Sequence, residues 1–260
     1  MNLLEKIKNK SKNTIKSLLS HEMVLVNKKV ITKYNYLLKK NYTVEIIKKI
    51  NDIDIIYEDN NIIVVNKPSG LLSISTEKET EKTLYKYISD YVKKSNKNAK
   101  IFVVHRLDKD TSGIVIFSKN QDFKNKLQQN WNDEVIRNYY AVVEGILEKK
   151  SGTIKSYLKE NSFHKTYSSN KGELAITNYE VIKTNDLYSL LKVNIKTGKK
   201  NQIRVHLSDI NHPIVGDKKY GSKIRAKRLM LCAYNVEFKN NSKYKFEIPY
   251  PEEFKKYIKA

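Results

Sequence analysis

The stretch HRLDKDTSG, residues 105–113, separates two short apolar runs, IFVV at 101–104 and IVIF at 114–117. Apolar runs of this length, bounded by polar residues, predict buried strands. A charged loop between two buried strands is held rigidly, which suits a catalytic carboxylate. The loop carries two carboxylates, Asp108 and Asp110. The same composition also suits an ordinary polar turn, because Asp and Ser side chains satisfy backbone groups in turns.

Strand-like segments continue on both sides of this loop. Those expected before it are residues 53–57 and 62–65, and those after it are residues 139–143, 152–158, 174–182, 188–195, 230–238 and 244–248. Apolar spacing predicts helices at residues 84–92, 123–131, 201–210 and 251–258. Thr76 with Glu79 is a candidate capping box before the first of these helices. Many strands without regular βαβ alternation predict an α+β fold, with a mixed, largely antiparallel sheet and flanking helices.

Residues 1–50 are predicted to form a separate small unit. They contain 12 lysines and three glutamates, so they contribute strongly to the net charge of +22. A helix begins near Ser11, a hairpin covers residues 24–31, and a further strand covers residues 42–47. These features predict a small, basic αβ domain that binds RNA, with a linker at residues 48–54 and a catalytic domain at 53–260. The alternative is a solvated subdomain of a larger fold.

The whole-chain composition narrows the classes of protein. An excess of 22 positive charges over 260 residues favours a polyanionic partner. The alternative is an AT-rich genome that places lysine at solvent-facing positions. A single cysteine excludes a disulfide framework and any multi-cysteine metal site. The apolar runs are far shorter than the ~20 residues of a membrane span, and the N-terminus lacks the apolar segment of a signal peptide. We therefore expect a cytoplasmic protein without membrane contact.

Arginine is rare, and its positions are informative. Only five of the 50 basic residues are arginine, namely Arg106, Arg137, Arg204, Arg225 and Arg228. A chain that uses lysine almost everywhere keeps arginine where a planar, bidentate cation is required. The alternative is that the five arginines occupy these positions by chance.

Three further polar blocks accompany the first. In TGKKNQIRVHL, residues 197–207, Arg204 lies near a predicted helix start, where it can pair with a carboxylate and favour its ionised form. In RNYYAVVEG, residues 137–145, a tyrosine can stack on a base or move a proton, or simply pack in the core. The Gly- and Pro-containing block NHPIVGDKKYGS, residues 211–222, is expected to form the rim of a site.

Together with KPSGLL, these blocks resemble the RluA-type RNA pseudouridine synthases, in order and across residues 66–234. The HRLD and TSG elements are the most specific part of the match. Residues 3–47 resemble the RNA-binding domain shared with a small-subunit ribosomal protein, the S-four type. The resemblance implies an isomerase with the pseudouridine synthase fold. The isomerisation needs no redox change, metal or nucleotide energy source, so we expect no cofactor and no metal, and a monomer is the default expectation.

The resemblance also implies roles for individual residues. Asp108 would be the nucleophile, Tyr139 would stack on the flipped uracil and take part in proton transfer, and Arg204 would pair with Asp108. Arg106 would help to extrude the target uridine. The remaining RNA-binding residues would be Lys67, Thr111, Ser112, Lys199, Lys200 and Gln202.

The sequence departs from the family pattern at three places, none of which removes a proposed catalytic group. The usual Gly-Arg-Thr is Gly198-Lys199-Lys200 here, and a common histidine before the glutamine is Asn201. A second common histidine, in a later strand, is Cys232. These changes affect expected RNA contacts and the subfamily.

The expected function is isomerisation of specific uridines to pseudouridine. An RNA-binding domain joined to this catalytic core resembles the synthases that act on large-subunit ribosomal RNA, so the resemblance implies that substrate. Alternatives are a synthase acting on tRNA and a non-catalytic RNA-binding or ribosome-assembly protein. A retaining glycoside hydrolase would need a second carboxylate about 5–5.5 Å from the first, and Asp110 is the nearest in sequence. The residues do not choose between attack on the base and a glycal-like route.

Overall fold

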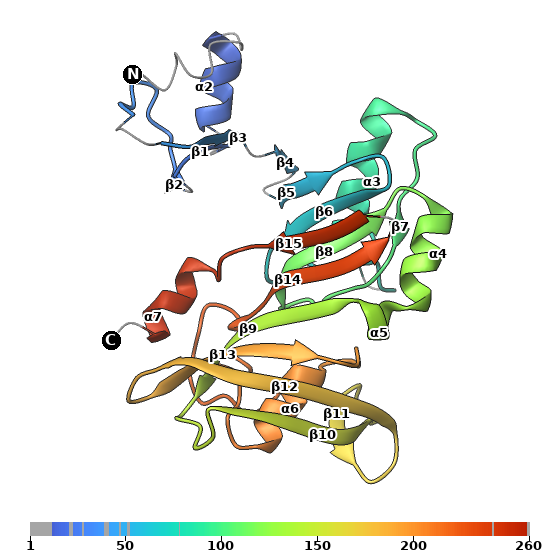
Figure 1. The fold of residues 1–260 in the computed structure, drawn as a ribbon, viewed down its shortest axis with the longest axis vertical. Helices are drawn as coiled ribbons and strands as arrows, with labels where there is room; N and C mark the ends of the chain where they lie inside the picture. The colour runs from blue at the N-terminus through green and yellow to red at the C-terminus, as the bar shows by residue number, and fades with distance from the viewer. Residues whose placement is uncertain are drawn as a thin grey trace. The chain divides into compact units, whose positions relative to one another are not determined.

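The computed structural model describes residues 12–258, except 21–22, 28, 39–41, 47, 51–52, 78 and 241. The chain divides into two compact units, Met1–Ile56 and Tyr57–Ala260 (Figure 1). None of the helices in the described ranges is long and apolar enough to cross a membrane.

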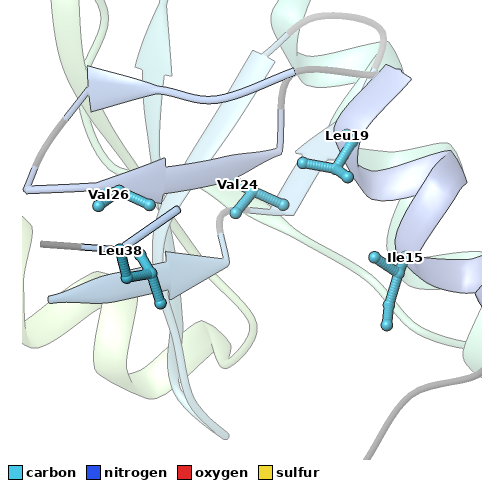
Figure 2. Packing of buried hydrophobic residues seen from close by; sticks show 5 residues of the cluster. All are labelled: Ile15, Leu19, Val24, Val26 and Leu38. Atoms are coloured by element: carbon cyan, nitrogen blue, oxygen red, sulfur yellow. The ribbon is translucent and has the colours of Figure 1, made fainter. Parts of the chain in front are cut away.

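The first unit combines one helix with a small sheet. Helix α2 covers Lys12–Ser20, and the sheet has the order β2-β1-β3, with β1 at Val24–Val26, β2 at Lys29–Val30 and β3 at Val44–Ile46. Asn27 lies in the hairpin turn with φ 49°, a left-handed conformation that Asn tolerates better than most residues. The core consists of Ile15, Leu19, Val24, Val26 and Leu38 (Figure 2).

These elements confirm the helix, hairpin and strand predicted for this part of the sequence; Ser11 and Ile47, the outer ends of that prediction, lie outside the described residues. The predicted linker is different. Residues 48–50 form strand β4, Lys48–Ile50, which pairs antiparallel with β5, Ile53–Glu58. Alternating apolar residues at Ile53 and Ile55 favour this strand, and both are buried.

The second unit is built on one large sheet with the order β11-β10-β12-β13-β9-β14-β8-β6, to which β15 is added on β14 and β7 on β8. The strands are β6 Ile62–Lys67, β7 Phe102–Val103, β8 Ser112–Ser118, β9 Ile136–Glu144, β10 Ser151–Glu160, β11 Thr166–Ser169, β12 Glu173–Thr184, β13 Tyr188–Ile195, β14 Leu231–Asn240 and β15 Ser242–Glu247. Strands β14 and β8 pair in parallel, whereas β10 with β12, β12 with β13, β13 with β9, β9 with β14 and β6 with β8 pair antiparallel. The predicted α+β fold with a largely antiparallel sheet is confirmed.

Helices flank this sheet. They are α3 Leu84–Ser95, α4 Gln121–Gln129, α5 Trp131–Glu134, α6 Gln202–Asp209, the 3-10 turn η1 Glu252–Phe254 and α7 Lys255–Ile258. The predicted capping box is wrong: Thr83 caps α3, and its hydroxyl accepts from the amide of Lys86 at 3.2 Å. Thr76 and Glu79 close a separate turn. The apolar spacing of residues 123–131 spans two helices, because Asn130 interrupts them.

The order of the strands determines where the motifs meet. Strand β14 lies between β8, which follows the HRLD loop, and β9, which carries Tyr139. The parallel contact is unusually close at Gly113, where an added Cβ atom would lie 2.2 Å from the carbonyl oxygen of Ala233. Gly113 also has φ +116°, a conformation that L side chains rarely adopt. Glycine at the end of the TSG element therefore allows the two strands to pair.

Candidate active site

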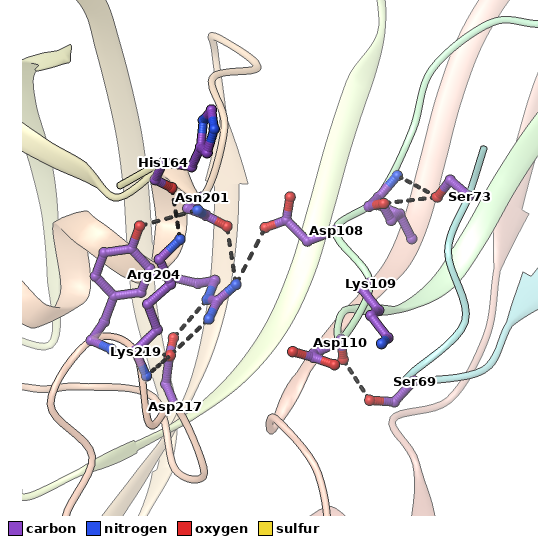
Figure 3. A network of polar contacts seen from close by, with 12 residues as sticks. Ser69, Ser73, Asp108, Lys109, Asp110, His164, Asn201, Arg204, Asp217 and Lys219 are labelled. Atoms are coloured by element: carbon purple, nitrogen blue, oxygen red, sulfur yellow. Dashed lines mark hydrogen bonds and ion pairs between the residues drawn. The ribbon is translucent and has the colours of Figure 1, made fainter. Parts of the chain in front are cut away.

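The loop that carries Asp108 is fastened to the preceding loop by buried polar contacts. The ammonium of Lys67 donates to three main-chain carbonyls, those of Pro68 at 3.0 Å, Leu71 at 2.7 Å and Lys109 at 2.9 Å. Ser73 binds both the amide and the carbonyl of Leu107, and Ser69 donates to the carbonyl of Asp110 at 2.6 Å (Figure 3). The backbone on both sides of Asp108 is thus held in place.

Lys67 is fully buried, and burial lowers its pKa to about 7. The nearby Asp110 and Asp108 carboxylates favour the charged ammonium, whereas burial opposes it. A lysine in this position fastens one loop to another and is not presented to solvent. The sequence assigned Lys67 to RNA binding, but the structure places it beneath the site.

Asp108 faces the helix that carries Arg204. The distance from Arg204 Nη1 to Asp108 Oδ2 is 3.7 Å, and the Asp108 side chain is 32% exposed. Burial raises the pKa of Asp108, while the positive charges of Arg204, Arg106 and Lys67 favour its ionised form. The net direction is upward, so the partial burial of this carboxylate outweighs the cations around it.

Arg204 is oriented by other partners. Its Nε and Nη2 bind the two oxygens of Asp217 at 2.7 and 2.8 Å, and its Nη1 donates to Asn201 Oδ1 at 3.0 Å. The ring of Tyr220 lies 5.0 Å from the guanidinium carbon. The bidentate contact to the fully buried Asp217 fixes the plane of the guanidinium, which leaves Nη1 as the atom that faces Asp108 (Figure 3).

Sequence reasoning missed Asp217 as a partner of Arg204. The block at 211–222 was expected only to form a rim. A usable signal was present, because buried charges are usually paired and Asp217 is the acidic residue of that block.

Tyr139 completes the group. It is 9% exposed and lines a pocket of about 320 Å³ together with Asp108 and Arg204. Burial raises the pKa of Tyr139 to about 12, and Arg137 acts against that rise. The phenol therefore remains protonated near neutral pH, which allows it to donate a hydrogen bond.

A second hollow adjoins the first at Asp108, Asn201 and Arg204, with a volume of about 840 Å³. Its wall is rich in basic side chains, namely Lys109, Lys200, Lys218, Lys219, Lys227 and Arg228. The ion pair of Asp108 and Arg204 thus lies between a compact pocket and a wider, cationic groove. The shape and charge suit a base entering the pocket from a polyanionic strand.

Five of the other six residues predicted to bind RNA line one of the two cavities. Arg106, Thr111, Lys199 and Gln202 line the pocket, and Lys200 lines the groove. Arg106 is exposed, whereas Lys199 and Lys200 form ion pairs with Glu173 and Glu160 at 2.6 and 2.7 Å. Ser112 lines neither cavity.

Two of these side chains, Gln202 and Ser112, are hydrogen-bonded to other groups of the protein and are not free to bind RNA. Gln202 is buried, and both ends of its amide are bonded, to Thr197 and the amide of Lys199 on one side and to Ile176 and Thr177 on the other. Ser112 is buried and accepts a hydrogen bond from Arg228. Both side chains therefore support the walls of the site.

Asn201 and Cys232, which differ from the family pattern, both lie inside the protein. Asn201 precedes α6 in a left-handed conformation with φ 55°, and its amide donates to the hydroxyl of Tyr220 at 3.1 Å. Cys232 is buried next to Ser112, and burial raises its thiol pKa to about 11. Among the described residues no cluster of three or more His, Cys, Asp or Glu side chains is arranged to bind a metal ion.

Comparison with known proteins identifies the family. The family model described as RNA pseudouridylate synthase matches residues 61–209. An uncharacterized RNA pseudouridine synthase of Bacillus subtilis is 33% identical over 226 residues, which cover 81% of this chain and 74% of that protein. Ribosomal large subunit pseudouridine synthase D of Borreliella burgdorferi is 37% identical over 216 residues, 78% of this chain and 66% of that protein.

A solved structure supports the fold. The human protein named RNA pseudouridylate synthase domain containing 4 superposes with a TM-score of 0.67 at 22% identity, over 77% of this chain and 89% of that one. The family model covers more than half of the chain and includes the HRLD loop, β9 and α6. The chain therefore belongs to the RluA-type family of RNA pseudouridine synthases and is an isomerase that acts on RNA.

Proposed function

We propose that this synthase uses Asp108 as its nucleophile and that its substrate is large-subunit ribosomal RNA. The observation that carries the first part is the convergence of Asp108, Arg204 and Tyr139 on one pocket of about 320 Å³. That volume lies at the small end of ligand pockets and suits one nucleotide extruded from its strand.

The reaction breaks the bond between N1 of uracil and C1′ of ribose and forms a bond between C5 and C1′. The proton on C5 is lost, and N1 gains one, so the change is an isomerisation without redox chemistry. An ionised Asp108 suits covalent catalysis at the sugar or the base, and equally suits removal of a sugar proton on a glycal-like route. Arg204 stabilises charge that develops next to the carboxylate.

Base extrusion accounts for the remaining residues. Removing a uridine from its stack costs a few kcal/mol, and stacking on an aromatic ring contributes about 1–3 kcal/mol. Tyr139 offers that ring inside the pocket. Arg106 is exposed at the pocket mouth and makes no hydrogen bond or ion pair with the described part of the chain, so its guanidinium can occupy the space that the base vacates.

Ribosomal RNA is favoured over tRNA by two observations. Two relatives, from Borreliella burgdorferi and Blochmanniella floridana, carry the name ribosomal large subunit pseudouridine synthase D. The basic N-terminal unit, proposed as an RNA-binding domain of the S-four type, would supply salt-sensitive phosphate contacts outside the catalytic pocket. We further propose that the enzyme works as a monomer in the cytoplasm.

The test is tritium release from transcripts labelled at C5 of uridine, with large-subunit rRNA and a tRNA pool as separate substrates. Wild-type protein should release tritium from the rRNA, and Asp108→Asn should release none. Asp110→Asn is a matched control, because it removes the other carboxylate of the same loop and should retain activity. Substantial turnover by Asp108→Asn would overturn the assignment of the nucleophile.

The substrate and the catalytic role are judged separately in this assay. Release from tRNA alone would overturn the rRNA assignment and leave the nucleophile intact. If neither pool reacts, ribosomal subunits purified from cells lacking the enzyme are the next substrate. Binding to all of these RNAs without release from any would favour a non-catalytic RNA-binding protein.

A further inference from the structure

Two buried arginines line the pocket, and they differ in their partners. Arg204 has the bidentate carboxylate of Asp217 and faces Asp108. Arg137, on β9, is 4% exposed and forms no ion pair with any described carboxylate. Its Nη2 donates to the carbonyl of Lys196 at 3.1 Å, whereas its buried Nε has no hydrogen-bond partner.

The surroundings of Arg137 are neutral. Trp131 lies with its ring centre 5.9 Å from the guanidinium carbon, and it stacks on His105 at 4.6 Å. Burial lowers the pKa of His105 to about 3, so the imidazole is uncharged, and its Nε2 already accepts from the amide of Ile116. Tyr139 stays protonated because burial raises its pKa.

A buried guanidinium without a counter-charge is costly. Arg137 keeps unused N–H donors at the pocket wall. The absence of a side chain at Gly198 gives its guanidinium space, because a Cβ atom added to Gly198 would lie 2.9 Å from Arg137 Nη1. The missing partner is therefore an anion small enough to enter the pocket. On an RNA substrate the anionic group is the phosphodiester.

We propose that Arg137 binds a phosphodiester oxygen of the RNA, next to the nucleotide that enters the pocket. Arg137 and Tyr139 are two residues apart on one strand, so their side chains project from the same face about 7 Å apart. That spacing is of the order of the distance between a base and a neighbouring phosphate. The proposal rests on the proposed function only in placing the target uracil at Tyr139 and Asp108.

Binding assays separate this role from catalysis. All variants are made in the Asp108→Asn background, so that RNA is bound without turnover. The first probe is a 12-nucleotide oligouridylate, with its dissociation constant measured over a range of salt concentrations. Arg137→Gln should weaken binding about 10-fold, as expected for loss of a charged hydrogen bond, and should reduce the slope of log K against log salt by about 0.7.

The second probe locates the phosphate. Oligonucleotides carry single neutral methylphosphonate linkages at successive positions, in oligouridylate and, once the target is mapped, around the target uridine. With Arg137 present, one linkage should weaken binding about 10-fold, and with Arg137→Gln the same linkage should cost less than 2-fold. Arg225→Gln, which removes an exposed arginine outside both cavities, should show no such coupling at any linkage.

Two further variants address folding. Arg137→Lys keeps the charge and should retain part of the affinity, and Gly198→Ala should crowd the guanidinium and weaken binding while leaving Arg137 in place. Melting temperatures identify any variant that is simply unfolded. The proposal is supported if, in folded variants, one linkage weakens binding only when Arg137 is present.

Three results would overturn it. In the first, Arg137→Gln lowers the melting temperature and the folded variants show no dependence of any linkage effect on Arg137. In the second, no methylphosphonate linkage weakens binding more in the presence of Arg137 than in its absence. In the third, the effect of Arg137 depends on replacement of the uracil 4-carbonyl and not on any linkage. Failure of the proposed function would look different. Asp108→Asn would then still produce pseudouridine, or wild type would produce none, and the binding measurements would stand unchanged.

Discussion

At the scale of single residues, the site places a carboxylate where water solvates it poorly and compensates with cations. Burial raises the pKa of Asp108, and Arg204 is the strongest opposing charge. Such a carboxylate is less stable as an anion than an ordinary aspartate, and an anion with little solvation is a more reactive nucleophile. The same feature predicts a penalty for folding and a shifted pH dependence.

The first prediction concerns pH. Because the pKa of Asp108 is raised, kcat/KM should fall on acidification from a pH above that of an ordinary aspartate, whose pKa is about 3.9. Arg204→Gln removes the main opposing charge, so its acidic limb should lie at still higher pH. Measured pH profiles of both proteins test this order, and a limb of Arg204→Gln at lower pH would contradict it.

The second prediction concerns stability. An aspartate whose folded pKa exceeds its unfolded pKa destabilises the fold above the folded pKa, and this penalty disappears as the pH falls through the folded pKa to the unfolded value. Asp108→Asn should therefore have a higher melting temperature than wild type at pH 7–8. The gain should vanish towards pH 3. An equal or lower melting temperature at neutral pH would show that the cations outweigh burial.

The third prediction concerns the orientation of Arg204. Asp217→Asn breaks a buried bidentate pair and should cost about 3–5 kcal/mol of stability. The released guanidinium should move onto Asp108, so kcat should fall and the acidic limb should move to lower pH, opposite to Arg204→Gln. Glu252→Gln breaks an exposed pair with Lys255 and should cost less than about 1 kcal/mol.

The residues that the sequence identified are those with a distinctive chemical setting. Asp108 and Arg204 stood out because a charged loop divides two apolar runs and because arginine is rare, and the structure brings them to 3.7 Å. Lys67 was assigned to RNA binding only through the resemblance to the family. Only the fold reveals that three carbonyls of two loops converge on its ammonium.

At the scale of elements, the site depends on how closely two strands approach each other. Among the described residues the parallel pairing of β8 and β14 joins only two residue pairs, Cys232 with Ser112 and Ala233 with Gly113. Strand periodicity predicted most strands, since alternating burial is visible in the sequence. It could not predict this pairing or the short strand β11, because local patterns do not specify partners distant in sequence.

The fourth prediction tests that approach. Gly113→Ala would place a Cβ atom 2.2 Å from the carbonyl of Ala233 in a conformation that alanine rarely adopts. It should cost about 3 kcal/mol or more and should lower kcat, because separation of the strands displaces Asp108. Gly70→Ala is the matched control: it also has positive φ, but its added Cβ meets nothing within 4 Å. Similar losses in both variants would show that backbone strain, not strand contact, is responsible.

At the scale of the whole molecule, charge is spread beyond the pocket. The net charge of +22 implies binding to RNA that is strong at low salt and weakens steeply as salt is added. A lysine-rich composition alone would give the same charge. If the charge serves RNA binding, particular lysines of the N-terminal unit contribute to substrate affinity. If the charge reflects composition alone, these lysines contribute no more than lysines elsewhere.

The fifth prediction separates them. In the N-terminal unit Lys29 and Lys33 are exposed, and Lys29→Glu with Lys33→Glu should raise KM for the long rRNA transcript several-fold and leave kcat unchanged. Lys93→Glu with Lys94→Glu on α3 makes the same change of charge in the other unit. Equal effects of the two double variants would indicate general attraction and contradict a dedicated RNA-binding unit.

The position of β14 has a consequence for the timing of activity during protein synthesis. Asp108 and Tyr139 lie in the first 140 residues of the chain. The strands that position them, β8 and β9, are joined by β14, Leu231–Asn240, which comes much later in the sequence. A growing chain emerges from the ribosome in order, so both residues leave the exit tunnel long before the strand that unites them. We therefore expect a nascent chain to become active only after residues 231–240 have left the tunnel and paired with both strands.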